Sequence, residues 1–167
     1  KKVMDTVMGS YRPDAIVIQC GADSLSKDRL GHLNLSMKGH AECLNYMFRF
    51  GVPAVILGGG GYTIENVSRC WAYETAVILG TEIDNNIPEK DQFYSCYEQD
   101  SHKLHFDIEQ RPNDNSREYL DDILRTIVEN IRESEIRPSV AFHSVPKRYL
   151  PEEELEWKMI GEEEDSM

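Results

Sequence analysis

The chain has 167 residues, of which 40% are hydrophobic and 29% are charged, enough for one domain with a buried core. Its 30 acidic residues outnumber its 18 basic ones, and a net charge of −12 argues against a protein held on nucleic acid or an anionic membrane by overall charge. The four cysteines lie far apart, without a Cys-x-x-Cys pair, as expected for buried free thiols in the nucleus or cytoplasm rather than for a secreted protein.

Helical and strand patterns alternate along the first half of the chain, which favours a parallel α/β layer. In chain order the sequence predicts a helix over 2–10, a strand over 15–20, a helix that Ser36 caps, a strand over 54–57 and a helix over 64–79. On the last of these helices we expect Val67, Trp71, Ala72 and Thr75 to face the core.

Two short apolar runs carry most of the information about function. Ala15 to Cys20 and Ala54 to Leu57 are rich in aliphatic residues, which is typical of parallel strands covered on both faces. The carboxyl ends of such strands share one edge of the sheet, and ligands bind at that edge. Asp23 and Tyr62, which follow the two runs, are therefore expected to face one crevice as a metal ligand and a donor that polarises a carbonyl group.

The second half of the chain gives weaker signals. Residues 80–100 predict a long irregular connection, 103–106 a short edge strand, and a helix capped by Asp114 or Ser116 is expected through Ile131. Two parallel strands are too few for a complete sheet of this class, so we expect the missing strands to come from residues before Lys1.

Four consecutive glycines, Gly58 to Gly61, follow the second strand and let another group approach the backbone closely. A tight turn would explain them, but four directly after a buried strand favour a site. A phosphate-binding loop would need a Lys-Ser/Thr pair after the glycines, and a dinucleotide fingerprint would need glycine where Thr63 stands. Nucleotide binding is therefore the weaker reading.

The individual residues of this chain do not complete a metal site. A catalytic zinc takes three protein ligands, and Asp23 supplies one carboxylate, better held than that of Asp28 because it is closer to the strand end. The five histidines are each expected to be surface or capping residues rather than ligands. Most aspartates in loops are turn residues, so these residues do not name a reaction by themselves.

Three longer motifs resemble the C-terminal half of class I (Rpd3-type) zinc-dependent histone deacetylases. They are QCGADSLSKDRLG (19–31), NLSMKGHAEC (34–43) and LGGGGYTIENVSRCWAYET (57–75), and the similarity extends over about residues 1–140. The resemblance implies the α/β arginase/deacetylase fold, a parallel sheet flanked by helices, of which this chain carries the C-terminal portion. Residues 141–167 are expected to form an acidic, disordered tail.

The resemblance also implies roles for individual residues. Asp23 corresponds to a zinc ligand, and Tyr62 to the tyrosine that hydrogen-bonds the acetyl carbonyl oxygen as water attacks. Leu30, Gly60 and Gly61 would line the tunnel for the lysine stem, with Cys20 just below the metal. Arg29 matches one position that binds a regulatory inositol phosphate. Glu65 reverses the charge of the partner position, which puts that regulation in doubt.

The function implied is the zinc-dependent removal of acetyl groups from histone lysines, which represses transcription. The expected location is the nucleus, with the cytoplasm as a second possible location. Acetylated histone tails and corepressor subunits are the expected partners, with no direct nucleic acid or membrane binding. The family's two remaining zinc ligands and its catalytic His-His pair are expected before Lys1, so this chain alone is expected to have little or no activity and poor stability. The alternative is a truncated, non-catalytic relative that serves as a binding module in a chromatin complex.

Overall fold

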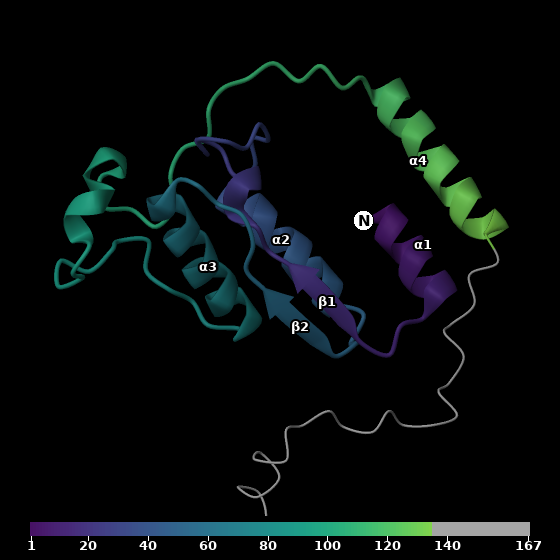
Figure 1. The fold of residues 1–167 in the computed structure, drawn as a ribbon, viewed down its shortest axis with the longest axis horizontal. Helices are drawn as coiled ribbons and strands as arrows, with labels where there is room; N and C mark the ends of the chain where they lie inside the picture. Colours follow the sequence, from purple (N-terminus) through teal and green to yellow (C-terminus); the bar gives the residue numbers. More distant parts are fainter. Residues whose placement is uncertain (135–167) are drawn as a thin grey trace, which may run out of the picture.

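The computed structural model describes residues 1–134 of the chain (Figure 1). The elements in order are α1 (Lys2–Tyr11), β1 (Ile16–Gln19), the 3-10 turn η1 (Ala22–Ser24), α2 (Met37–Phe48), β2 (Ala54–Leu57), α3 (Ile64–Ile78), the 3-10 helix η2 (Tyr94–Asp100) and α4 (Arg117–Glu133). The predicted acidic tail, residues 141–167, lies outside the described residues. No helix of the described part is long and apolar enough to cross a membrane.

The two strands pair in parallel, as predicted. Ile16 lies opposite Ala54 and Gln19 opposite Leu57, with α2 as the connection between the strands. The pairing continues past β1, because the backbone N–H of Cys20 donates to the carbonyl oxygen of Leu57 over 2.8 Å. Both strands therefore end at the same level, which brings the loops that follow them to one edge.

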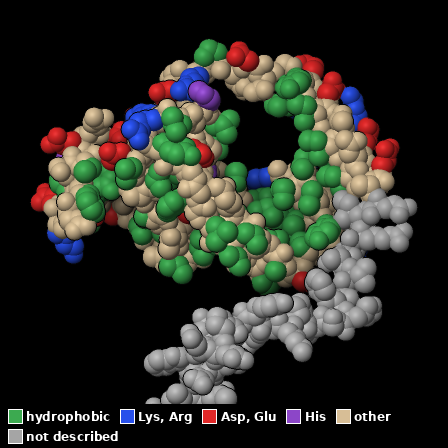
Figure 2. All heavy atoms as spheres, viewed as in Figure 1, with side chains coloured by type: hydrophobic (Ala, Val, Ile, Leu, Met, Phe, Trp, Pro, Cys, Tyr) green, Lys and Arg blue, Asp and Glu red, His purple; other side chains and the backbone are tan. Residues whose placement is uncertain are grey.

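The expectation that both faces of the strands are covered was wrong for the described residues. Burial alternates along each strand, and Val17, Val55 and Leu57 are 69%, 55% and 49% exposed. Figure 2 shows hydrophobic side chains gathered over the strands. A continuous apolar run predicts a strand whose two faces both suit burial, but it does not show which of them the same stretch of chain covers.

Helix α2 begins and ends as its sequence predicts. The hydroxyl oxygen of Ser36 accepts from the backbone N–H of Gly39 over 3.0 Å and caps the first turn. Gly51, with φ of +64°, follows the helix before Pro53. The apolar face buries Leu44, whereas Cys43 is exposed. Cys20 and Cys70 are the buried thiols, so the expectation of buried cysteines holds for two of the four.

The predicted core positions of helix α3 are confirmed in part. Val67 packs against the core and Trp71 is partly buried, whereas Ala72 and Thr75 are exposed. The fully buried residues of the helix are Asn66, Arg69, Cys70, Glu74 and Ala76. The Arg69 guanidinium donates to the Asn66 side-chain oxygen over 2.6 Å and to the Asp100 carboxylate over 2.8 Å. Because these buried polar groups satisfy one another, the inward face of α3 carries charge without a penalty from unpaired groups.

The second half of the described chain is mostly irregular. The predicted strand over 103–106 was wrong: a single antiparallel bridge joins Asn86 to Lys103. Helix α4 begins at its cap Ser116, as predicted, and lies beside α1 (Figure 1). No residue of α4 is buried within the described part of the chain, so its apolar positions are only partly covered.

Candidate active site

The loops after the two strands meet, as the sequence predicts. The backbone N–H of Ala22 donates to the carbonyl oxygen of Gly60 over 2.6 Å. This bond joins the turn that carries Asp23 to the loop of glycines before Tyr62. The parallel register thus places the two candidate residues on touching loops.

Glycines surround Asp23 because a side chain would collide with it. A Cβ on Gly60 would lie 2.1 Å from Asp23 Oδ2, and a Cβ on Gly31 would lie 1.6 Å from the Asp23 carbonyl oxygen. The half-buried Asp23 carboxylate accepts no hydrogen bond from any residue in the 1–134 range. Its oxygens are therefore free to coordinate a cation, which is what a zinc ligand requires.

Two consecutive residues hold the backbone of Tyr62. The Asp28 carboxylate accepts from the N–H of Tyr62 over 2.8 Å, and Arg29 Nε donates to the Tyr62 carbonyl oxygen over 2.7 Å. Asp28 also accepts from the N–H groups of Leu30 and Gly31. Desolvation of Asp28 opposes its ionisation, but the backbone hydrogen bonds outweigh it and lower its pKa. Asp28 and Arg29 thus help to hold the Tyr62 loop against the Asp23 loop.

The Tyr62 phenol takes no part in these backbone contacts with Asp28 and Arg29. Its side chain is 40% exposed, and no hydrogen bond to its oxygen occurs among residues 1–134. The ring can therefore act on a group outside the described chain without giving up a structural contact.

The remaining predicted site residues occupy the same region in different ways. Leu30 is 64% exposed next to the Asp28 turn. Gly61 has φ of +143°, and a Cβ there would lie 2.4 Å from Val67 on α3, so glycine allows the loop to approach that helix. The Arg29 guanidinium donates a hydrogen bond to the Tyr62 carbonyl oxygen, so it has a structural role that does not require a bound phosphate.

The chain contains one Asp-x-His sequence, Asp100 to His102, whose side chains make contacts away from the Asp23 loop. Asp100 pairs with Arg69 and Lys27, and the His102 ring stacks on Tyr94 at 3.9 Å between ring centres. Asp100 therefore supports α3 and the irregular segment rather than the Asp23 loop.

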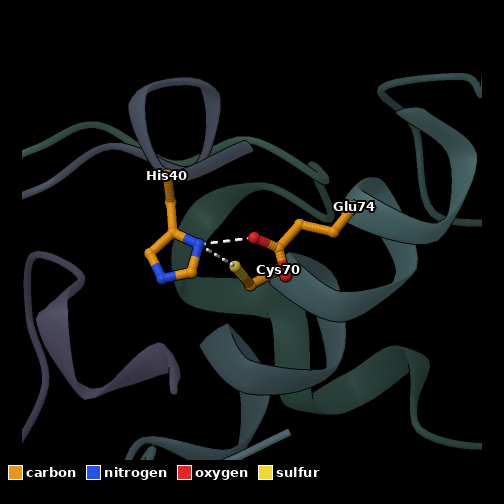
Figure 3. Close-up of side chains that lie close together, drawn as sticks. All are labelled: His40, Cys70 and Glu74. Atoms are coloured by element: carbon orange, nitrogen blue, oxygen red, sulfur yellow. Dashed lines mark hydrogen bonds and ion pairs between the residues drawn. The ribbon is translucent and has the colours of Figure 1, made fainter. Parts of the chain in front are cut away.

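Sequence reasoning missed a cluster behind the Asp23 loop. His40 on α2 and Cys70 and Glu74 on α3 point toward one another (Figure 3). His40 Nδ1 lies 2.5 Å from Glu74 Oε1, so the expectation of a surface or capping histidine was wrong. No sequence spacing links a residue of α2 to one of α3, and the burial of Cys70 and Glu74 is visible only in the structure. The nearby Cys20 thiol has its pKa raised to about 11 by burial and by the charges of Glu74 and Cys70.

Comparison with known proteins supplies the family. Residues 1–78 match the family model described as "Histone deacetylase domain". Histone deacetylase 19 of Arabidopsis thaliana is 49% identical over 146 residues, and Histone deacetylase 1 of Homo sapiens is 48% identical over 147 residues. Over most of its length the chain is similar to histone deacetylases. Type-1 histone deacetylase 1 of Dictyostelium discoideum is a further relative, at 43% identity over 146 residues.

The histone deacetylase matches cover most of this chain but a minor part of each relative. They span 87%, 88% and 87% of the chain, and 29%, 30% and 29% of the Arabidopsis, human and Dictyostelium proteins. The resemblance to class I deacetylases is thus confirmed, and with it the arginase/deacetylase fold class, of which the parallel β1–β2 pair is a part.

The cradle around Asp23 gives a direct prediction. Gly60→Ala is expected to destabilise the protein by about 1–3 kcal/mol, because the added methyl group would overlap the Asp23 carboxylate or force the loops apart. Urea denaturation of the complete protein measures the change in the free energy of unfolding. Gly9→Ala on α1 is the matched control, since a Cβ there meets nothing within 4 Å. Equal stability of Gly60→Ala and the control would show that the carboxylate does not sit against Gly60.

Proposed function

We propose that the protein carrying this chain is a zinc-dependent deacetylase that hydrolyses acetyl groups from lysine side chains of histones. The observation that carries the proposal is the identity of 48–49% to two proteins named histone deacetylases, together with the joined loops of Asp23 and Tyr62. Acetylated histone tails and corepressor subunits are the proposed partners, transcriptional repression the proposed outcome and the nucleus the proposed location.

Asp23 is proposed as one zinc ligand. Its carboxylate is free of hydrogen bonds from the described residues and is surrounded by glycines, which fits a metal ligand. Bound zinc would polarise the acetyl carbonyl group and lower the pKa of a water molecule. The other ligands and the general base and acid are proposed to come from residues outside this chain, which has no adjacent pair of histidines.

Tyr62 is proposed to donate its phenolic hydrogen to the oxygen of the acetyl group as negative charge develops there. A donor of this kind contributes most when it is held in place before the reaction, so that no reorganisation is needed. Asp28 and Arg29 provide that fixation through the backbone of Tyr62, on either side of the residue. The side chain stays free for the substrate.

Leu30, Gly60 and Gly61 are proposed to border the channel for the lysine stem. The exposed Leu30 side chain offers apolar surface to a chain of methylene groups, and the glycines leave room beside it. We assign Arg29 to the support of Tyr62 rather than to an inositol phosphate, because Glu65 stands at the partner position.

The proposal is tested by release of acetate from an acetylated histone-tail peptide by the complete protein. We expect turnover that stops when a chelator removes zinc and returns when zinc is added back. The unacetylated peptide controls for release that does not depend on the acetyl group. Tight binding of the acetylated peptide without acetate release would contradict the enzyme reading and favour the non-catalytic binding module.

A further inference from the structure

The cluster of His40, Cys70 and Glu74 joins three parts of the fold behind the Asp23 loop (Figure 3). His40 Nδ1 contacts Glu74 Oε1 at 2.5 Å, and Nε2 of the same ring lies 3.1 Å from the carbonyl oxygen of Gly21. Cys70 Sγ lies 3.9 Å from Nδ1. The His40 and Glu74 side chains are only 12% and 4% exposed. Water therefore competes little with these contacts.

The hydrogen-bond partners define the protons on the ring. A carbonyl oxygen only accepts, so Nε2 carries a hydrogen toward Gly21. An ionised carboxylate also only accepts, so Nδ1 carries one toward Glu74. The hydrogen bonds of Cys70 and Glu74, aided by the charge of Glu74, outweigh burial and raise the pKa of His40 to about 10. The ring is then an imidazolium, and both of its bonds are charge-assisted.

A shared metal ion is the rival reading of three such side chains. Two ligands of a tetrahedral zinc lie about 3.4 Å apart, since each is about 2.0–2.1 Å from the ion. The contact of 2.5 Å between His40 and Glu74 is too short for that and fits a hydrogen bond. The geometry therefore favours an ion pair over a metal site.

The ion pair of His40 and Glu74 contacts the turn through the carbonyl oxygen of Gly21, which accepts from His40 Nε2. Gly21 is buried and stands directly before η1, which carries Asp23. The next residue, Ala22, makes the bond to Gly60 that joins the two candidate loops. A fixed Gly21 carbonyl thus sets where the turn with Asp23 starts.

We propose that His40 is a positioning residue for the deacetylation site, which Glu74 holds as an imidazolium so that it fixes the Gly21 carbonyl and the turn that carries Asp23. The catalytic part of this inference rests on the proposed function. The hydrogen-bonded ion pair and its effect on the turn do not.

The pair predicts a particular dependence on pH. The groups facing His40 are Glu74 and Cys70 from α3 and Cys20 from the end of β1. Because the folded pKa of His40 is raised above its unfolded value, its contribution to stability is fully present below about pH 6.5 and is lost as the pH rises through about 10. Glu74→Gln keeps the shape of the side chain but removes the charge, while the contact with Cys70 remains, so the loss should move to a lower pH than in the unmodified protein.

The test uses Glu74→Gln in the complete protein, with Glu129→Gln on the exposed face of α4 as the matched control. NMR titration of the His40 ring, assigned with His40→Gln, should show that the ring loses its charge at a lower pH in Glu74→Gln than in the unmodified protein. Over the pH range where only the variant's ring is neutral, the Ala22 amide of that variant should be about fivefold to tenfold less protected from hydrogen exchange, because a neutral ring binds Gly21 without charge assistance. The kcat of deacetylation should fall over the same pH range by a similar factor.

Each outcome has one meaning for the proposal. A His40 ring that titrates near pH 6.5 in the unmodified protein, or equal Ala22 protection in both variants at every pH, would overturn it. So would a Co²⁺ complex whose thiolate absorption disappears in Cys70→Ser, since that would show a metal cluster. If the unmodified protein releases no acetate, the proposed function fails, while the ring titration and the Ala22 exchange still decide whether His40 positions the turn.

Discussion

Replacement of Tyr62 by phenylalanine is expected to lower the kcat of deacetylation by about 10²–10³-fold, the usual effect of removing one donor to a developing oxyanion. The phenol makes no hydrogen bond within residues 1–134, and the loop is fixed by backbone contacts with Asp28 and Arg29. Removal of the oxygen should therefore leave the loop in place and remove only the donor. Because this bond strengthens as charge develops, KM should change much less than kcat.

The measurement is steady-state acetate release by the complete protein with Tyr62→Phe, beside Tyr119→Phe as a control for the loss of an exposed phenol. Tyr119 lies on α4 and is 56% exposed, so its variant should keep full activity. A Tyr62→Phe enzyme with unchanged kcat would remove this residue from the chemistry, while leaving zinc-dependent hydrolysis open to test through Asp23.

The sequence predicts the local elements of the site better than their surroundings. The apolar runs before Asp23 and the four glycines predict two parallel strands, and the structure confirms their pairing and the contact of their loops. The strands and turns themselves depend on short-range patterns, namely β-branched runs, turn glycines and the Ser36 cap. Such patterns are legible in one sequence because each is satisfied within a few residues.

Burial between elements could not be predicted in this way. The apolar pattern of α3 favours Ala72 and Thr75 as core residues, yet Arg69 and Glu74 lie inside. Their burial depends on Asp100 and His40, which stand about thirty residues away in each direction along the chain. A polar side chain can be buried only where another group forms a hydrogen bond or ion pair with it, and the sequence around the residue does not show which distant group this is.

For the same reason, the sequence does not predict that Asp28 holds the backbone of Tyr62. Asp28 looks like an ordinary turn residue in the sequence, and half of its hydrogen-bonding role is that of a turn: it accepts from Leu30 and Gly31. The other half is the bond to the backbone of Tyr62, 34 residues further on. A turn residue that also bridges two strands' loops is visible only once the parallel register brings those loops together.

Replacement of Asp23 by asparagine is expected to weaken zinc binding by at least about a hundredfold, because loss of a direct ligand should exceed the 10–100-fold effect of losing an outer-shell partner. An amide oxygen is a neutral and poorer donor to zinc than a carboxylate. Stability of the metal-free protein should change little, since the carboxylate accepts no hydrogen bond from the described residues. The loss of zinc can therefore be separated from a loss of fold.

Zinc content per molecule and competition with a chelator measure the effect in the complete protein. Asp14→Asn, in the exposed turn before β1, is the control for removal of a negative charge and should bind zinc normally. Metal-free Asp23→Asn should match the metal-free parent protein in urea denaturation, while zinc should stabilise the parent protein and not the variant. An Asp23→Asn protein that keeps its zinc would mean that the carboxylate beside Gly60 serves the substrate or the loop rather than the metal.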